Sequence, residues 1–320
     1  MKTKHMKAIY ASLILGGMLA GISSVQAEDA SGTGSVPVTM TVSANVASNK
    51  RMPALNPEDI SVKRGKQVLP VTNLIPARGE RAGLDLFILI DDSSDSRFGL
   101  HLDDLRAFVQ AQPETTAIGV GYMRNGTVEV VSDLTVDHAR AAKAFRLPLG
   151  SPGAYGSPYL SVADLMKQWP QDDHRREVLM FTDGIDRARS HVGLHRGYNS
   201  NPDADTASAV AQRTGTMIHT IYVPAAGHLR HNYWQGTNGQ MNMARLSDAT
   251  GGESFYLGLH GPVSIKPYLD SLQQVLDNQY LLSFSAKPGK KAGLQTVKLS
   301  TEVAGVELST HDAVWVPAAR

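Results

Sequence analysis

Carboxylate and hydroxyl side chains follow apolar, strand-like runs at separate places in this chain. The run 86–90 leads into an acidic, serine-rich stretch, and the run 177–181 leads into a threonine and an aspartate. A glycine-rich loop between them offers a further hydroxyl at the start of a helical pattern. Oxygen atoms of this kind are the ligands that a hard divalent cation such as Mg²⁺ takes. The candidate metal ligands are Asp91, Ser93, Asp95, Ser157 and Asp183.

The elements that must position these ligands alternate between strand and helix patterns from Leu84 onward. Continuous apolar strands of this type are typical of a parallel sheet that is buried on both faces. Apolar residues at helical spacing separate them, so the sequence predicts an α/β fold with a doubly wound, mainly parallel sheet. Because the carboxyl ends of parallel strands share one edge of the sheet, the candidate ligands are expected to meet there. Helices are expected at 102–109, 136–145, 159–169, 204–213, 241–249 and 263–276.

At these residues the chain resembles the von Willebrand factor A (vWA) family. The segment 84–91, the loop around Ser157 and the segment 181–184 are similar in order and spacing to the metal-ion-dependent adhesion site (MIDAS) of that family. The flanking segments, with Tyr280-Leu-Leu and Val314-Trp-Val, resemble those of bacterial, acidobacterial-type members. The resemblance implies a Rossmann-like fold and a bound divalent cation. We expect Mg²⁺, with Mn²⁺ or Ca²⁺ as alternatives. The resemblance also implies a protein partner whose acidic side chain completes the metal shell.

The first metal segment departs from the family's Asp-x-Ser-x-Ser pattern, and two registers are open. Reading from Asp91 gives Ser93 and then Asp95, whereas reading from Asp92 restores both serines. We favour Asp91, because a slip of one residue reverses the faces of a strand. In that register the carboxylate of Asp95 could satisfy the metal internally, which would weaken its attraction for a partner's carboxylate.

Extensions flank the α/β domain, which we expect to span residues 84–278. Residues 1–27 combine lysines, a short apolar stretch and a small-residue cleavage pattern, which is typical of a signal peptide. A retained membrane anchor is disfavoured, because a spanning helix needs roughly 20 apolar residues. Residues 28–83 are expected to form a leader and a small β extension, and residues 279–320 a C-terminal β extension that packs on the domain. The sequence leaves open whether the two extensions meet.

Composition narrows the class of protein further. Hydrophobic residues make up 42% and charged residues 19%, so the chain can build a core and is not disordered as a whole. A net charge of +1 without a basic stripe argues against nucleic-acid binding. The chain contains no cysteine, which excludes disulfides and suits either a periplasmic or a secreted protein. After signal cleavage we expect no transmembrane segment.

Long polar loops are expected at the same sheet edge, at 185–203 and 224–240. The second carries a tyrosine and a tryptophan, residue types that often anchor protein interfaces. The alternative is that both rings fold back onto the domain. The first carries two histidines four residues apart, a spacing that suits a metal only on a helix, so a solvated or structural role is favoured over metal binding. The candidate partner-binding residues are Tyr233, Trp234, His191 and His195.

The leading functional hypothesis is an exported, cation-dependent module for recognition or adhesion, which binds a protein or a surface glycan. A structural scaffold whose metal only stabilises the fold is the main alternative. A metal-dependent hydrolase is a third, since Asp91 and Asp183 could activate a metal-bound water. The chain has no nucleophile elbow, zincin motif, cysteine nucleophile or Walker loop, and only a loop histidine such as His191 could act as a general base. We therefore expect that the protein is not an enzyme.

Overall fold

The structure is a computed structural model that describes residues 34–46, 52–170, 172–188, 201–229, 233–256, 258 and 260–319. The expected signal peptide, 1–27, lies outside the described residues, as do His191 and His195. From Gly34 onward the chain forms one compact unit.

The α/β part is built on a six-stranded sheet. Its strands are β5 (Leu84–Asp91), β6 (Thr116–Arg124), β7 (Thr127–Thr135), β8 (Arg175–Thr182), β9 (Thr216–Tyr222) and β10 (Ser254–Phe255). They lie in the order β10-β9-β8-β5-β6-β7, and only the pair of β6 and β7 is antiparallel. This sheet confirms the predicted α/β class with a mainly parallel, doubly wound arrangement.

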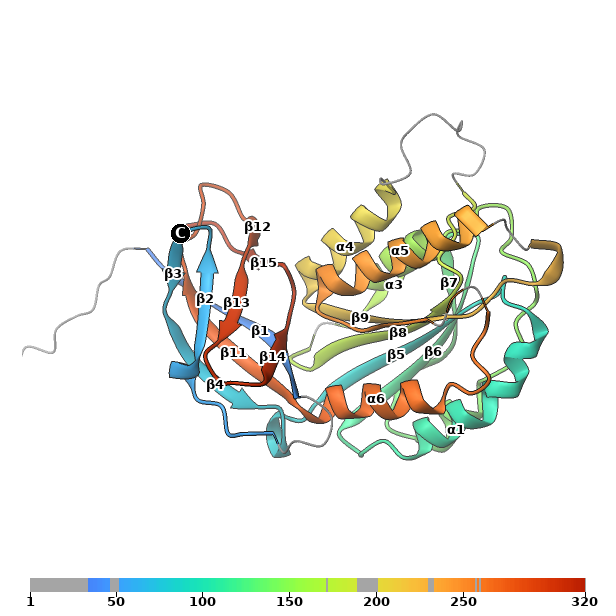
Figure 1. Ribbon diagram of the computed structural model, residues 1–320, viewed down its shortest axis with the longest axis horizontal. Coiled ribbons are helices and arrows are strands. Elements are labelled where there is room, and N and C mark those ends of the chain that lie inside the picture. The colour runs from blue at the N-terminus through green and yellow to red at the C-terminus, as the bar shows by residue number, and fades with distance from the viewer. Residues whose placement is uncertain are drawn as a thin grey trace, which may run out of the picture. The chain divides into compact units, whose positions relative to one another are not determined.

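Helices cover both faces of this sheet. The described α-helices are α1 (Leu102–Gln110), α2 (His138–Lys143), α3 (Pro158–Gln168), α4 (Pro202–Thr214), α5 (Tyr233–Thr250) and α6 (Lys266–Asp277). Helices α1, α2 and α6 share a core with one face, and α3, α4 and α5 share a core with the other. Figure 1 shows α3, α4 and α5 above the sheet and α1 and α6 below it. Within the described residues, no helix combines the length and apolarity that crossing a membrane requires.

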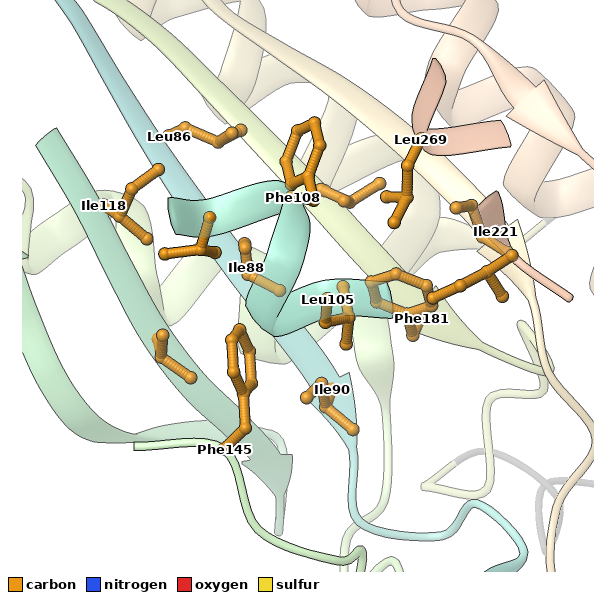
Figure 2. Close-up of a cluster of buried hydrophobic side chains, with 14 of the residues drawn as sticks. Leu86, Ile88, Ile90, Leu105, Phe108, Ile118, Phe145, Phe181, Ile221 and Leu269 are labelled. Atoms are coloured by element: carbon orange, nitrogen blue, oxygen red, sulfur yellow. The ribbon is translucent and has the colours of Figure 1, made fainter. Parts of the chain in front are cut away.

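Strand β5 is buried along its whole length, because strands pair with it on both sides and helices cover both faces. Its even-numbered residues, such as Ile88, pack with Leu105 of α1 in the core cluster of Figure 2. Its odd-numbered residues, such as Leu89, pack in the second cluster with α3. Because side chains alternate along a strand, Asp91 lies on the α3 side, at the carboxyl end of the sheet.

The Asn125-Gly126 pair turns the chain from β6 into β7, as predicted. Asn125 has a φ of 55° and Gly126 a φ of 70°, the left-handed conformation that a two-residue hairpin turn requires. Asn125 also accepts a hydrogen bond of 2.7 Å from the N–H of Ala154 and donates its own N–H to Pro152 over 2.9 Å. The hairpin therefore anchors the glycine-rich loop that precedes Ser157.

The N- and C-terminal extensions form one β unit. Its strands are β1 (Val36–Val46), β2 (Ile60–Arg64), β3 (Gln67–Leu69), β4 (Val71–Pro76), β11 (Gln279–Ala286), β12 (Gly293–Thr296), β13 (Lys298–Thr301), β14 (Val306–Ser309) and β15 (Ala313–Val316). Strand β1 pairs antiparallel with β11, and β2 pairs antiparallel with β13. Apolar residues of both extensions share one core. The long-range pairing of β1 with β11, which the sequence left open, therefore joins the two extensions.

Two strands expected in the extensions are interrupted. The run 68–71 is divided at Pro70, which has no N–H to donate to a neighbouring strand. The run 296–300 is divided at Val297, because β12 pairs with β15 whereas β13 pairs with β2. A change of partner leaves no trace in the alternation of apolar residues, so the sequence could not reveal it.

The loop expected at 224–240 is shorter than predicted, because α5 already begins at Tyr233. Its first turns contain Gly236 and Gly239, and glycine disfavours a helix by about 1 kcal/mol relative to alanine. Both glycines are buried, and a Cβ atom at Gly239 would lie 2.3 Å from the carbonyl oxygen of Asp183. The glycines therefore allow α5 to approach the end of β8. Because this reason for glycine in a helix lies in tertiary packing, the local sequence did not predict that the helix begins so early.

Candidate metal centre

Candidate ligands from three segments converge at the carboxyl edge of the sheet. Asp91 at the end of β5, Ser157 at the start of α3 and Arg187 after β8 line one cavity of about 10 Å³. Asp183 joins them through an ion pair with Arg187. The strand register, which sets Ile90 opposite Phe181, brings the ends of β5 and β8 together. Segments that are distant in sequence thus meet in the way that a parallel sheet predicts.

The carboxylate of Asp91 is buried, with 4% of the residue exposed. Its Oδ1 atom accepts the N–H of Ser93 over 2.8 Å, and its Oδ2 atom accepts the hydroxyl of Thr182 over 2.7 Å. Burial raises the pKa of Asp91, and the charge of Asp183 raises it further, while the charge of Arg187 opposes both. Asp91 is therefore a buried carboxyl group whose charged form a nearby cation favours.

Hydroxyl groups complete the oxygen-rich edge. Ser93 is buried, and its Oγ atom has no hydrogen-bond partner among the described residues. A buried hydroxyl without a partner is unfavourable, so this oxygen is available to a ligand. Ser157 is the N-cap of α3, and its Oγ atom accepts the N–H of Leu160 over 3.3 Å, with Pro158 at the first helical position.

Asp183 is the second buried carboxylate, and its partner is a guanidinium group. Arg187 donates from Nη1 to Oδ1 of Asp183 over 3.1 Å and from Nη2 to Oδ2. The side chain of Asp183 is 4% exposed and that of Arg187 10% exposed. Burial works against the charge of Arg187, but the neighbouring carboxylate of Asp183 raises the pKa of this arginine above its usual value. Arg187 is not among the residues predicted from the sequence, although its position four residues after Asp183 was a signal.

Asp95 pairs with a neighbouring arginine. Its Oδ1 atom accepts the backbone N–H of Arg97 over 2.9 Å and the Nε–H of the same residue over 3.0 Å. Asp95 also lines a different cavity, together with Pro224 and His260. In this structure the carboxylate of Asp95 caps a short helical turn and pairs with Arg97, and its place in the metal shell stays a prediction.

The structure distinguishes the two registers of the first metal segment. The side chain of Asp92 is fully buried and forms an ion pair of 2.7 Å with Arg146, whose guanidinium stacks 3.6 Å above the ring of Tyr122. Asp91 instead faces Thr182 at the end of β8. Asp91, rather than Asp92, therefore carries the carboxylate that faces the candidate centre.

Of the expected partner residues, Tyr233 and Trp234 lie in the first turn of α5. They are 66% and 70% exposed and contact each other edge to face, with ring centroids 5.9 Å apart. Rings this exposed do not fold back onto the domain, so the alternative reading is wrong for both. Their helix also contains Gly239, which packs against the Asp183–Gly184 backbone.

A second group that could hold a metal ion comprises Asp85, Asp172 and His174. The Nδ1 atom of His174 lies 3.0 Å from Oδ1 of Asp85, and the indole N–H of Trp169 donates to Oδ2 over 3.3 Å. Burial raises the pKa of Asp85. Asp85 lies near the amino end of β5, opposite the edge where ligands of an open α/β sheet gather. This group was not predicted from the sequence, where its signal was a carboxylate inside an apolar strand.

The first group fits a hard divalent cation on the evidence of its own donor atoms. Two buried carboxylates, Asp91 and Asp183, stand close enough for one to raise the pKa of the other. The buried Oγ atom of Ser93 has no partner within the described chain. All of these donors are oxygens, as Mg²⁺ prefers. In this structure the guanidinium of Arg187 supplies the positive charge at that point.

No family model matches this chain, and no curated protein matches it. The chain is similar to an aerotolerance-related membrane protein from Bacteroides fragilis NCTC 9343, at 14% identity and a TM-score of 0.43, over 61% of this chain and 99% of that one. It is similar to the SpRpn10 VWA domain, at 9% identity and a TM-score of 0.38, over 58% and 94%. It is also similar to the ArnB paralog VWA2 from Sulfolobus acidocaldarius, at 11% identity and a TM-score of 0.35, over 88% and 76%. These likenesses are weak, so the fold class rests on the strand order and helix packing described above.

Proposed function

We propose that this chain is an exported vWA-type module that binds a divalent cation and thereby recognises an acidic side chain of a protein partner. The preferred cation is Mg²⁺. The proposed ligands are Asp91, Ser93, Ser157 and Asp183. When bound, the cation supplies a positive, oxygen-seeking centre for the partner's carboxylate. The module takes part in recognition or adhesion, and no catalytic step is assigned to it.

The observation that carries this proposal is the meeting of two buried carboxylates, one of which accepts the backbone N–H of Ser93, whose own buried hydroxyl has no partner among the described residues. Two carboxylates out of water repel each other unless a cation lies between them. Asp91, Ser157 and the arginine that binds Asp183 line the same small cavity. This arrangement supports a cation centre at the edge of the sheet where ligands of open α/β folds bind.

The exposed aromatic pair supports a recognition surface close to this centre. Tyr233 lies six residues before Gly239 on α5, a distance of about 9 Å along a helix axis. Gly239 itself packs on the backbone of Asp183. A partner that places a carboxylate at the centre would therefore have Tyr233 and Trp234 within reach as apolar anchors.

A thermal melt of residues 28–320 in EDTA, and then with Mg²⁺, Mn²⁺ or Ca²⁺, tests cation binding. A cation that binds only the folded state stabilises it by about 2.7 kcal/mol at a hundredfold excess over its Kd. For a chain of this size we expect the midpoint to rise by roughly 4 °C. Asp183→Ala should abolish the rise. Asp95→Ser is the matched control and should retain it, because the carboxylate of Asp95 is bound to Arg97.

The second acidic group requires its own control. If His174→Ala abolishes the rise and Asp183→Ala does not, the cation binds beside Asp85 and the proposal is wrong. If no cation raises the midpoint of the wild type, the proposal also fails. A chelation-sensitive partner, recovered with the wild type and lost with Trp234→Ala, would support recognition. A rise in midpoint with no partner of that kind would favour the scaffold, whose metal only stabilises the fold.

A further inference from the structure

The side chain of Arg187 reaches back into the proposed cation centre. Both of its terminal nitrogens donate to the two oxygens of Asp183, so the pair is bidentate. The Nη1 atom also donates to the carbonyl oxygen of Ile185 over 3.3 Å. Charge-assisted bonds of this kind are about twice as strong as neutral ones, and here both partners are almost wholly buried.

The backbone around Arg187 is fastened on both sides of the centre. The N–H groups of Arg187 and Ala188 both donate to the carbonyl oxygen of Gly156, over 2.7 and 3.1 Å. Gly156 directly precedes the proposed ligand Ser157. At the other end of the segment, the hydroxyl of Tyr159 donates to the carbonyl oxygen of Gly184 over 2.7 Å. The segment 184–188 therefore forms a strap that holds the guanidinium between the end of β8 and the start of α3.

The space at this point does not admit a second cation. The cavity that Asp91, Ser157 and Arg187 line has a volume of about 10 Å³, which is about the space of one water molecule. A divalent cation requires its own shell of oxygens at about 2.0–2.6 Å. A guanidinium that occupies both oxygens of Asp183 removes that ligand, and its charge would repel a metal ion a few ångströms away.

We infer that Arg187 is a tethered competitor of the cation: the guanidinium and a divalent ion are alternative partners of Asp183, so cation binding must displace Arg187 and loosen the strap from Gly156. This inference rests on the proposed function, because it concerns occupancy of the same centre. The inference adds that Arg187 regulates the affinity for the cation, which the ligand residues alone do not imply. The apparent affinity for the cation is lowered by the free energy of breaking the Asp183–Arg187 pair, and a partner that binds the released strap would raise it.

The test compares cation binding by the wild type, Arg187→Gln and Arg187→Lys. Isothermal titration calorimetry measures the affinity for Mg²⁺, and titration followed by electron paramagnetic resonance measures that for Mn²⁺. Without the competitor, Arg187→Gln should bind the cation at least about tenfold more tightly. Arg187→Lys, which retains the charge but not the bidentate geometry, should lie between. Arg97→Gln is the matched control, because Arg97 pairs with Asp95 and is 68% exposed. It should bind within about twofold of the wild type.

A second readout separates competition from a merely structural role. In EDTA, Arg187→Gln should melt below the wild type, because Asp183 loses its partner while it remains buried. In saturating Mg²⁺ the order should reverse or the two midpoints should coincide. If Arg187→Gln melts below the wild type by the same amount in both conditions and binds the cation no more tightly, this inference is overturned while the proposed cation site stands. If no variant binds a cation, both are overturned.

Discussion

The hydroxyl of Thr182 donates a hydrogen bond of 2.7 Å to the Oδ2 atom of Asp91 and thereby joins the ends of β8 and β5. The same oxygen of Thr182 accepts the N–H of Gly184 over 3.1 Å. One side chain thus orients the first proposed carboxylate and the turn that carries the second. Thr182 is not a proposed metal ligand, yet it positions two segments that supply ligands.

Replacement of Thr182 by valine should lower the free energy of unfolding by about 1–3 kcal/mol, because a buried carboxylate oxygen and a backbone N–H lose their partner. Urea denaturation monitored by circular dichroism measures this. Thr182→Ser retains the hydroxyl and should lose less than about 1 kcal/mol. A larger loss for Thr182→Ser than for Thr182→Val would mean that the methyl group, rather than the hydrogen bond, is what matters.

The close approach of α5 to the end of β8 leads to a second prediction. Gly239→Ala should destabilise the protein by about 1–3 kcal/mol, because its Cβ would lie 2.3 Å from the carbonyl oxygen of Asp183. Helix propensity alone would favour alanine by about 1 kcal/mol. Gly227→Ala, where a Cβ meets nothing within 4 Å, is the control and should change stability by less than about 0.5 kcal/mol. A stabilised Gly239→Ala variant would contradict the packing described here.

Removal of Arg146, which neutralises Asp92, should lower the free energy of unfolding more than Thr182→Val or Gly239→Ala does. Arg146→Ala leaves a fully buried carboxylate without its ion-pair partner, which costs about 3–5 kcal/mol in unfolding free energy. Asp92→Leu in the same chain should recover part of that loss, since no charge then remains buried. Because Asp92 faces away from the proposed centre, the cation-induced rise in midpoint should persist in Arg146→Ala. Loss of the rise would instead favour the Asp92 register.

Acid should destabilise the protein through His311, whose pKa burial lowers from 6.5 to about 4, against the raising influence of the Thr216 backbone and Glu177. Above pH 6.5 the imidazole is neutral in both the folded and the unfolded chain, so it adds no pH dependence there. Below that value the unfolded chain binds a proton that the folded chain excludes, so stability falls as pH drops from 6.5 to about 4. The full effect is roughly 3 kcal/mol at 1.36 kcal/mol for each pH unit.

The comparison of His311→Asn with the wild type isolates this residue, because every other titrating group is common to both chains. We expect unfolding free energies measured between about pH 7 and about pH 4.5 to fall less steeply for the variant. Parallel profiles for the two proteins would mean that His311 titrates normally in the folded state.

Much of the fold follows from local patterns in the sequence. Continuous apolar runs predicted β5 and β8, and apolar residues at helical spacing predicted α1, because burial of a strand or of a helix face selects residues at a characteristic period. The Asn125-Gly126 pair predicted the hairpin, because few other residues accept the conformation of its turn. Parallel strands also end at one edge, so the meeting of Asp91, Ser157 and the end of β8 could be predicted from their places in the chain.

Contacts between distant segments decided the rest. The burial of Asp92 depends on its ion pair with Arg146, the insertion of Arg187 depends on its hydrogen bonds to Gly156, and the early start of α5 depends on packing against Asp183. The sequence by itself determined the strands, most of the helices and the edge where the oxygen ligands gather, because periodicity and strand direction are local properties. Only the tertiary structure decided that Asp92 pairs with Arg146 and how the two extensions pair, because such choices depend on charges and backbone groups brought together from far apart in the chain.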